Sequence, residues 1–413
     1  MKKAEFDWAV VGGGISGVAL SEMLSRNGHS VIILEKNSKL ASETTKEFHE
    51  WLHTGVLFSL VPDNFSTTRY LLGALDDLLE FYSSFGGMNI TKLEQGLQIR
   101  DEGWFNKDWI YYNYRNRPTN PAWMYSVAKS ILLSETISNH DWLRRHAGGD
   151  EIIAKLKTDK IIKKMLSIYK QKNKYISIKS SDFTINSRKL LAELLSAAMA
   201  NGTKVYCENA FERISEYANY VKIRTQNGEY SAKNVVFCSP DLIAKLFGSK
   251  IKYGYAPMGV FEGVPDDQKS FVNLDFYTRN CINLLRKKDG LGLAGGITVN
   301  KQSDVKDYFD YVHSEHIKLN PSLRLINNYV GVKKELVDAN FKRNYQYHIQ
   351  KNSERQWSVV LGKFSLFASL AVEFYRRVYS VNPVLSKGLA MNTESKKLIE
   401  PTFWAEITST EEM

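Results

Sequence analysis

Cysteine is scarce in this chain, and the cysteines that are present form no pattern. Cys207, Cys238 and Cys281 lie far apart among 413 residues, with no Cys-x-x-Cys pair. We therefore expect neither a disulfide framework nor a zinc site, and we predict no metal. Such limited use of cysteine favours a reducing, cytoplasmic setting.

Long apolar runs and low-complexity segments are also missing. No run reaches the roughly 18 apolar residues that a membrane-spanning helix needs. The 9 prolines, the 43% of hydrophobic residues and the 24% of charged residues are typical of a globular protein. At about 100–200 residues per domain, the length predicts two or three domains, or one large one.

The net charge of +10 is concentrated in one place. Residues 151–180 hold nine lysines and two acids, and the apolar residues from position 152 to 169 fall roughly on one face of a predicted helix. This helix could be a solvated one packed on its own domain. It could also rest peripherally on an anionic membrane, at the inner face. Nucleic acid is not predicted as a partner, because the charge is local.

The first forty residues contain the clearest motif. An apolar run at 6–11 predicts a buried strand, and a second run at 31–34 predicts another. Between them lies a helical pattern that opens with a Gly-x-Gly-x-x-Gly fingerprint: Gly12, Gly13, Gly14, Ile15, Ser16, Gly17. In this context the glycines allow a tight turn and the approach of a pyrophosphate to the helix N-terminus.

Glu35 ends the second strand, about 20 residues after the fingerprint. A carboxylate at this point can accept hydrogen bonds from both ribose hydroxyls, and it disfavours a 2′-phosphate. The fingerprint thus predicts a dinucleotide and argues against NADP. It leaves FAD and NAD open.

The next segment carries a resemblance. Thr44 and Thr45 are followed by Leu52-His53-Thr54-Gly55. This order resembles the D-amino-acid-oxidase superfamily of FAD-dependent oxidoreductases, above all its glycerol-3-phosphate dehydrogenase and L-2-hydroxyglutarate oxidase branches. Later stretches continue the resemblance in order, at residues 186–205, 228–237, 294–299, 331–333 and 362–365.

Two departures from the family pattern stand out. Cys238-Ser239-Pro240 follows Phe237, where the family usually has Asn-Ala-Ala-Gly. Lys333 replaces an arginine that clamps a substrate anion in the family, and lysine lacks the bidentate fork of arginine.

The resemblance implies FAD as the cofactor and an α/β (α+β overall) fold. This fold combines a Rossmann-like FAD-binding domain, with a mostly parallel sheet, and a discontinuous substrate domain with an antiparallel sheet. The predicted FAD-binding domain comprises residues 1–85, 182–255 and 355–395, and the predicted substrate domain comprises residues 86–181 and 256–354. Residues 396–413 form a C-terminal tail, with residues 408–413 expected to be frayed.

The resemblance also implies the site residues. The catalytic candidates are His53 as proton acceptor, Lys333 for a substrate anion and Lys363 for flavin or substrate; Tyr277 and Arg279 are weaker candidates. The predicted cofactor-binding residues are Gly12, Gly13, Gly14, Ile15, Ser16, Gly17, Glu35, Lys36, Thr44, Thr45, Phe211, Gly362, Lys363, Phe364 and Ser365.

We therefore predict an enzyme that oxidises a CH–OH group of a small anionic molecule, a 2-hydroxy acid or a polyol phosphate, by hydride transfer to flavin N5. Oxygen, a quinone or another carrier would accept the electrons. An amine or amino-acid oxidase on the same fold is the first alternative, because one fold hosts both. A non-catalytic dinucleotide-binding or membrane-associated protein is the second.

Overall fold

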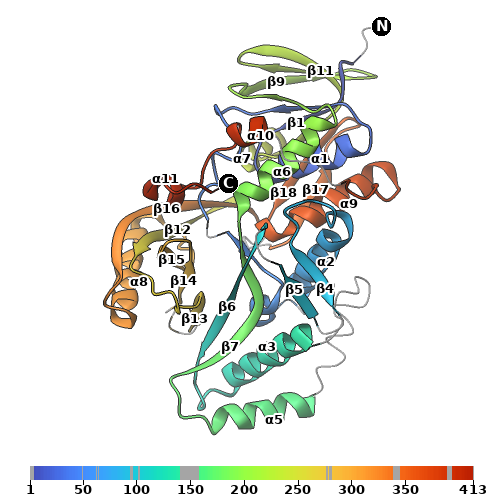
Figure 1. Ribbon diagram of the computed structural model, residues 1–413. Helices are drawn as coiled ribbons and strands as arrows, with labels where there is room; N and C mark the ends of the chain where they lie inside the picture. Colours follow the sequence, from blue (N-terminus) through green and yellow to red (C-terminus); the bar gives the residue numbers. More distant parts are fainter. Residues whose placement is uncertain are drawn as a thin grey trace.

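The computed structural model describes residues 4–412 except 49, 62, 64, 94–95, 101–102, 140–157, 276–277, 279–280, 338–344 and 388–392. Two large sheets organise the described chain (Figure 1). The first contains β1 (Phe6–Val11), β2 (Val31–Leu34), β8 (Lys204–Tyr206), β9 (Phe211–Glu216), β10 (Val221–Thr225), β11 (Gly228–Phe237), β17 (Tyr347–Lys351) and β18 (Gln356–Leu361).

The first sheet is mostly parallel, as the sequence predicts. Its main order is β17-β18-β11-β1-β2-β8, in which every neighbouring pair except β17–β18 is parallel. β1 and β2 occupy the predicted runs 6–11 and 31–34 without change. Both are buried on both faces, which explains why they are continuous apolar runs in place of alternating ones.

The second sheet is mostly antiparallel, with the order β16-β12-β15-β14-β13-β6-β7-β3. Only the β13–β6 pair among these neighbours is parallel. Its strands are β3 (Trp51–Leu52), β6 (Phe105–Arg115), β7 (Tyr175–Ile185), β12 (Ile251–Glu262), β13 (Phe271–Leu274), β14 (Ile282–Arg286), β15 (Gly292–Gly296) and β16 (Arg324–Leu336). A separate hairpin pairs β4 (Ile90–Leu93) with β5 (Gly96–Ile99).

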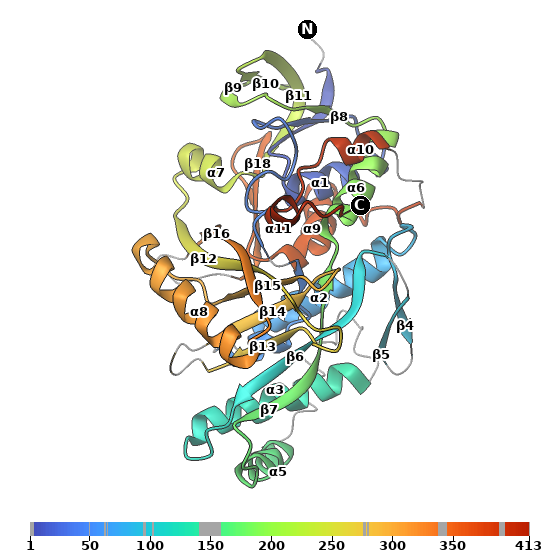
Figure 2. The same ribbon diagram turned by 60° about the vertical axis from the view of Figure 1, so that its left-hand side comes forward.

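Helices surround the sheets in the described part of the chain (Figure 2). They are α1 (Ile15–Arg26), α2 (Ser66–Phe81), α3 (Pro121–Asn139), α5 (Thr158–Tyr169), α6 (Ser187–Ala200), α7 (Pro240–Phe247), α8 (Val305–Leu319), α9 (Phe367–Tyr379), α10 (Thr393–Lys397) and α11 (Phe403–Thr408). Short 3₁₀ turns are η1 (Val56–Leu60), η2 (Gln302–Asp304) and η3 (Phe364–Leu366). None of the helices in the described ranges is both long and apolar enough to cross a bilayer.

Two of the predicted domain boundaries fall inside strands. β7 runs through 181/182 and β12 runs through 255/256, so these strands extend across the proposed divisions. The domain limits stay a prediction, and the two large sheets are what the structure itself defines.

The C-terminal segment packs against the loop that follows β2. The Leu40 amide donates to Leu398 O at 2.8 Å, and the Glu400 amide donates to Leu40 O at 3.0 Å. Further along, both carboxylate oxygens of Glu412 accept hydrogen bonds from Thr402, at 2.8 and 2.6 Å. The expectation of a frayed end was therefore wrong for residues 408–412, because these contacts fix the segment.

Glu50 joins parts of the chain that are far apart in sequence. Its Oε1 accepts hydrogen bonds from the Ser187 amide and hydroxyl at 2.9 and 2.6 Å. Its Oε2 lies 2.6 Å from Lys287 Nζ and accepts a 3.0 Å hydrogen bond from Trp404 Nε1. The side chains of Glu50 and Lys287 are each only 5% exposed, so they form a buried ion pair. Together with Ser187 and Trp404, this pair joins four segments of the chain.

Replacing Lys287 with methionine should destabilise the protein by about 3–5 kcal/mol, because the Glu50 carboxylate would stay buried without its cation. Urea unfolding followed by far-UV circular dichroism measures the effect as a lower midpoint. Arg324→Met is the matched control: its ion pair with Glu262 is 76% and 44% exposed and should contribute less than about 1 kcal/mol. Equal midpoints for the two variants would contradict the structural role of Lys287.

Candidate active site and dinucleotide cavity

The fingerprint glycines form a turn that leads into α1. Gly12 has a φ of +108°, which favours glycine. A Cβ on Gly17 would lie 1.9 Å from Gly12 O, so only glycine allows the helix to approach the turn this closely. The N-cap is Gly14, which has no side chain to cap the helix, and the first turn contains no acid. The Ile15 amide donates a 3.3 Å hydrogen bond to Thr45 Oγ1. The helix N-terminus is therefore suited to a phosphate.

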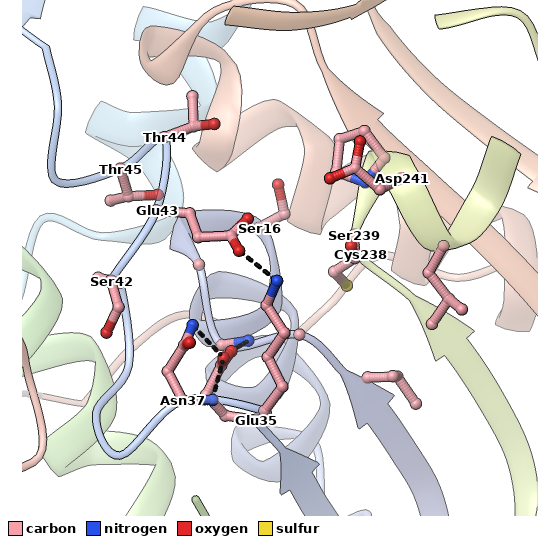
Figure 3. Close-up of a pocket in the computed structure, with 18 of the residues that line it drawn as sticks. Ser16, Glu35, Asn37, Ser42, Glu43, Thr44, Thr45, Cys238, Ser239 and Asp241 are labelled. Carbon is pink, nitrogen blue, oxygen red and sulfur yellow. Dashed lines mark hydrogen bonds and ion pairs between the residues drawn. The ribbon is translucent and has the colours of Figure 1, made fainter. Parts of the chain in front are cut away.

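A cavity of about 380 Å³ opens at this turn (Figure 3). Most of the predicted cofactor residues line it: Gly12, Gly13, Gly14, Ile15, Ser16, Glu35, Lys36, Thr44, Thr45 and Phe211. Gly17 instead packs behind the turn. The cavity thus brings together residues from β1, α1, β2, the loop after it and β9.

Glu35 is held at the end of the cavity by main-chain donors. Its Oε2 accepts a 2.7 Å hydrogen bond from the Gly13 amide. Its Oε1 accepts two bonds of 2.9 Å from the amide and the side chain of Asn37. The carboxylate is thus fixed beside the glycine turn, where the sequence predicts contact with a ribose.

The opposite wall contains the residues that depart from the family pattern. Figure 3 shows Cys238, Ser239 and Asp241 across the cavity from Thr44 and Thr45. Burial raises the pKa of the Cys238 thiol, so this side chain is an uncharged part of the wall. Although Cys238-Ser239-Pro240 lacks the glycine of the family pattern, these residues still form a wall of the cavity.

A chain of ion pairs adjoins the same cavity. Lys36 pairs with Glu43, Glu43 pairs with Lys334 at 3.1 Å, and Lys334 pairs with Asp241. The sequence analysis named only Lys36 among these four. Lys334 belongs to β16 and Asp241 to α7, so the ion pairs connect the second sheet to the first through the cavity wall.

The catalytic candidate His53 lies at a buried carboxylate. His53 Nδ1 is 3.2 Å from Asp182 Oδ2, which also accepts hydrogen bonds from Tyr112 and, at 3.0 Å, from Trp51 Nε1. Asp182 Oδ1 accepts two more from the amide and hydroxyl of Thr54, at 2.8 and 2.6 Å. The carboxylate is fully buried, and five donor groups surround it.

These contacts set the charges of the pair. Burial opposes ionisation of Asp182, but hydrogen bonds from His53, Thr54 and Tyr112 outweigh it and hold the pKa of the carboxyl below its usual value. Burial lowers the pKa of His53 to about 4, against the opposing effect of Asp182. His53 is therefore neutral near pH 7. With Nδ1–H donating to Asp182, its Nε2 keeps a lone pair.

Both predicted lysines lie near this histidine. The positive charges of Lys363 and Lys333 each contribute to the lowered pKa of His53. Lys363 Nζ lies 5.0 Å from the ring centre of Phe58, and Lys333 Nζ lies 5.1 Å from that of Phe48. Phe58 also packs on His53, with ring centres 5.2 Å apart, so Lys363 and His53 share this neighbour.

The turn at residues 362–365 connects the cavity to the histidine. Val360 and Leu361, at the end of β18, line the cavity, whereas the predicted Gly362, Lys363, Phe364 and Ser365 do not. Instead, Ser365 Oγ accepts a 2.8 Å hydrogen bond from the His53 amide. The turn precedes α9, which begins at Phe367.

Asp182 is the main residue that the sequence analysis missed. A lone acid directly before the run Phe183-Thr184-Ile185 was a usable signal, because a carboxylate in a buried strand needs several donors. Its partners were not foreseeable, since His53 is 129 residues away. The weaker candidates Tyr277 and Arg279 lie outside the described residues.

The fold and the glycine turn have the features of a dinucleotide-binding protein, and comparison with known proteins identifies the family. The model of the DAO family, described as "FAD dependent oxidoreductase", matches residues 7–260, which is more than half of the chain. The chain therefore belongs to this family and is an FAD-dependent enzyme. This result decides against NAD and against the non-catalytic alternative.

Solved structures agree with the fold. Glycine oxidase from Geobacillus kaustophilus superposes with a TM-score of 0.61 at 15% identity, over 94% of this chain and 96% of that one. L-alpha-glycerophosphate oxidase from Mycoplasma pneumoniae, with FAD bound, gives 0.62 at 14% identity, over 94% and 97%. At such identities the likeness shows the fold alone.

A curated relative matches only in part. UDP-galactopyranose mutase from Mycoplasma pneumoniae is 33% identical over 96 residues, which are 23% of this chain and 22% of that protein. The chain thus covers about a fifth of the length of this relative, and the match carries no conclusion about activity.

The residues present fit FAD. The N-terminus of α1, which has no acid in its first turn, suits the pyrophosphate, and the fixed carboxylate of Glu35 suits the ribose. The cavity continues along Val360 and Leu361 towards the turn that contacts His53. We assign the ten lining residues to the dinucleotide part of FAD and residues 362–365 to its flavin end, as a proposal.

Glu35→Ala should weaken FAD binding by about 10- to 100-fold, the size expected when hydrogen bonds to a charged acceptor are lost. The measurement is quenching of FAD fluorescence on titration into the apoprotein. Glu212→Ala, on an exposed face of β9, is the control and should bind FAD like the wild type. Full affinity in Glu35→Ala would show that the ribose is held elsewhere.

Proposed function

We propose that this enzyme oxidises a CH–OH group of a small anionic molecule, such as a 2-hydroxy acid or a polyol phosphate. The observation that carries the proposal is the neutral His53, oriented by Asp182 and accompanied by two lysine charges. Bound FAD supplies the hydride acceptor for this chemistry. The protein supplies a base, an anion site and an enclosed environment.

His53 is proposed to take the hydroxyl proton. Its Nδ1 is committed to Asp182, so Nε2 is the nitrogen that can accept a proton from substrate. No hydrogen bond to Nε2 is present among the described residues. Asp182 then stabilises the imidazolium that forms, as a fixed negative charge on the other side of the ring.

Lys333 and Lys363 are proposed to hold the anionic group of the substrate. Both ammonium groups lie beside aromatic rings, and both act electrostatically on His53. An anion bound there would offset their charges. A lysine is a point charge, so this pair suits a carboxylate or a phosphate without requiring bidentate geometry.

The alternative substrate is an amine or an amino acid. The similarity in fold to a glycine oxidase keeps this alternative in view. An alcohol must lose its hydroxyl proton when it is oxidised, whereas an amine that binds in its neutral form needs no such base. The ordered His53–Asp182 pair therefore favours the alcohol.

Anaerobic titration of the FAD-loaded enzyme decides between the two classes. Hydroxy acids, polyol phosphates and amino acids are added separately, and loss of the oxidised flavin absorbance is recorded. We expect bleaching by an anionic alcohol. Bleaching by amino acids alone would overturn the proposed substrate class.

His53→Ala should slow reduction of the flavin by substrate about 10²- to 10⁴-fold, the usual contribution of a positioned base. Stopped-flow absorbance under anaerobic conditions gives the rate constant. His313→Ala, on α8, serves as the control and should reduce at the wild-type rate. A wild-type rate in His53→Ala would end its role as base.

The rate of flavin reduction should not show a histidine titration between about pH 5.5 and 8, because the pKa of His53 is lowered to about 4. An unperturbed histidine would give a midpoint near about 6.5. Lys363→Met should move the acid limb to higher pH, since it removes a charge that lowers the pKa of His53. An unmoved acid limb in this variant would separate Lys363 from His53.

A further inference from the structure

Only part of the apolar surface of helix α5 packs against the rest of the molecule. Ile161 and Ile168 are buried, 5% and 2% exposed, and belong to the core that includes α3. Ile162, Leu166 and Tyr169 are 50%, 56% and 63% exposed. Their spacing of four and three residues places them on one helix face, so they form an exposed apolar stripe.

Lysines border this stripe. Lys163 and Lys170 are exposed and lie within about 60° of Leu166 around the helix axis, at 100° per residue. Lys160 is exposed as well, whereas Lys164 pairs with Glu135 of α3. Asp159 is the only acid of the helix. Asp159 lies about 20° from Leu166 around the axis, so apolar side chains and a net positive charge occupy one continuous surface.

The position of α5 leaves this surface accessible. Figures 1 and 2 both show α5 at the end of the described chain farthest from the N-terminus and from β9–β11. α3 lies between α5 and the rest of the molecule in both views. Residues 151–157, the first part of the basic segment, lie outside the described residues, so the argument rests on α5 alone.

We propose that the outer face of α5 binds the surface of an anionic lipid bilayer. The stripe of Ile162, Leu166 and Tyr169 enters the boundary between headgroups and acyl chains, and the bordering lysines contact anionic headgroups. Such a combination is what interfacial helices use. The inference does not depend on the proposed substrate or on His53.

Two other occupants fit less well. A second copy of the same face would bring the exposed lysines of the two helices together, with Asp159 as the only acid of each helix to offset them. A nucleic acid would account for the lysines, but it would leave exposed Ile162 and Leu166 without apolar partners. A lipid surface satisfies both the charge and the apolar side chains.

Co-sedimentation of the FAD-loaded, full-length protein with vesicles tests the proposal. We expect binding to vesicles of phosphatidylcholine with phosphatidylserine to be at least about tenfold stronger than to phosphatidylcholine alone, and to weaken with salt. Lys163→Gln should reduce binding by about fivefold. Ile162→Ser/Leu166→Ser should reduce it by at least about tenfold.

Matched exposed positions on α8 provide the controls. Leu319 is 55% exposed and the Lys306 side chain is 83% exposed, so Leu319→Ser and Lys306→Gln should leave vesicle binding unchanged. The flavin spectrum and the thermal midpoint of each α5 variant should equal those of the wild type, because the substituted side chains are at the surface. Flavin reduction by substrate should also be unaffected.

Three results would overturn the proposal. One is equal binding of the wild type and the serine double variant to anionic vesicles. Another is a dimer in light scattering that the double variant abolishes, which would assign the stripe to a second copy. The third is retention on nucleic acid that Lys163→Gln weakens, in the absence of vesicle binding.

Discussion

A buried carboxylate is stable only if donors surround both of its oxygens, and this constraint shapes the region around His53. Glu50 and Asp182 both meet it. Glu50 gathers Ser187, Lys287 and Trp404, while Asp182 gathers donors from β3, β6 and the loop that follows β3. Glu50 begins the short segment 50–54, and Asp182 binds its other end through His53 and Thr54. The backbone that carries His53 is therefore fixed at both ends.

The alternation of side chains along β16 divides two tasks between neighbouring lysines. Lys334 turns towards Glu43 and Asp241 at the dinucleotide cavity, whereas Lys333 lies over Phe48 near His53. Successive residues of a strand point to opposite faces, so a shift of one residue in the β12–β16 pairing would exchange these positions. The register of this long antiparallel pair therefore determines which lysine faces the cavity and which faces Phe48.

Local patterns were enough to predict the first strand, the glycine turn, the second strand and Glu35, because their interactions are close in sequence. The motif resemblance named His53, Lys333 and Lys363 as site residues, which stays a prediction, and the contacts around these residues are tertiary. Asp182, Lys334 and Asp241 depend on pairs between distant strands and helices, which no local pattern encodes. The limits 181/182 and 255/256 lie inside β7 and β12, which continue across the points where the motifs change, and the domain division stays a prediction.

The order of the elements along the chain has a consequence for biosynthesis. β1, α1 and β2 leave the ribosome early, yet the cavity that they begin is lined by Val360 and Leu361 and its loop is held by Leu398 and Glu400. A nascent chain that ends before residue 400 lacks the strand contacts that secure the loop after β2. The cavity is therefore complete only after residues 360–400 have been made, long after the glycine turn that begins it.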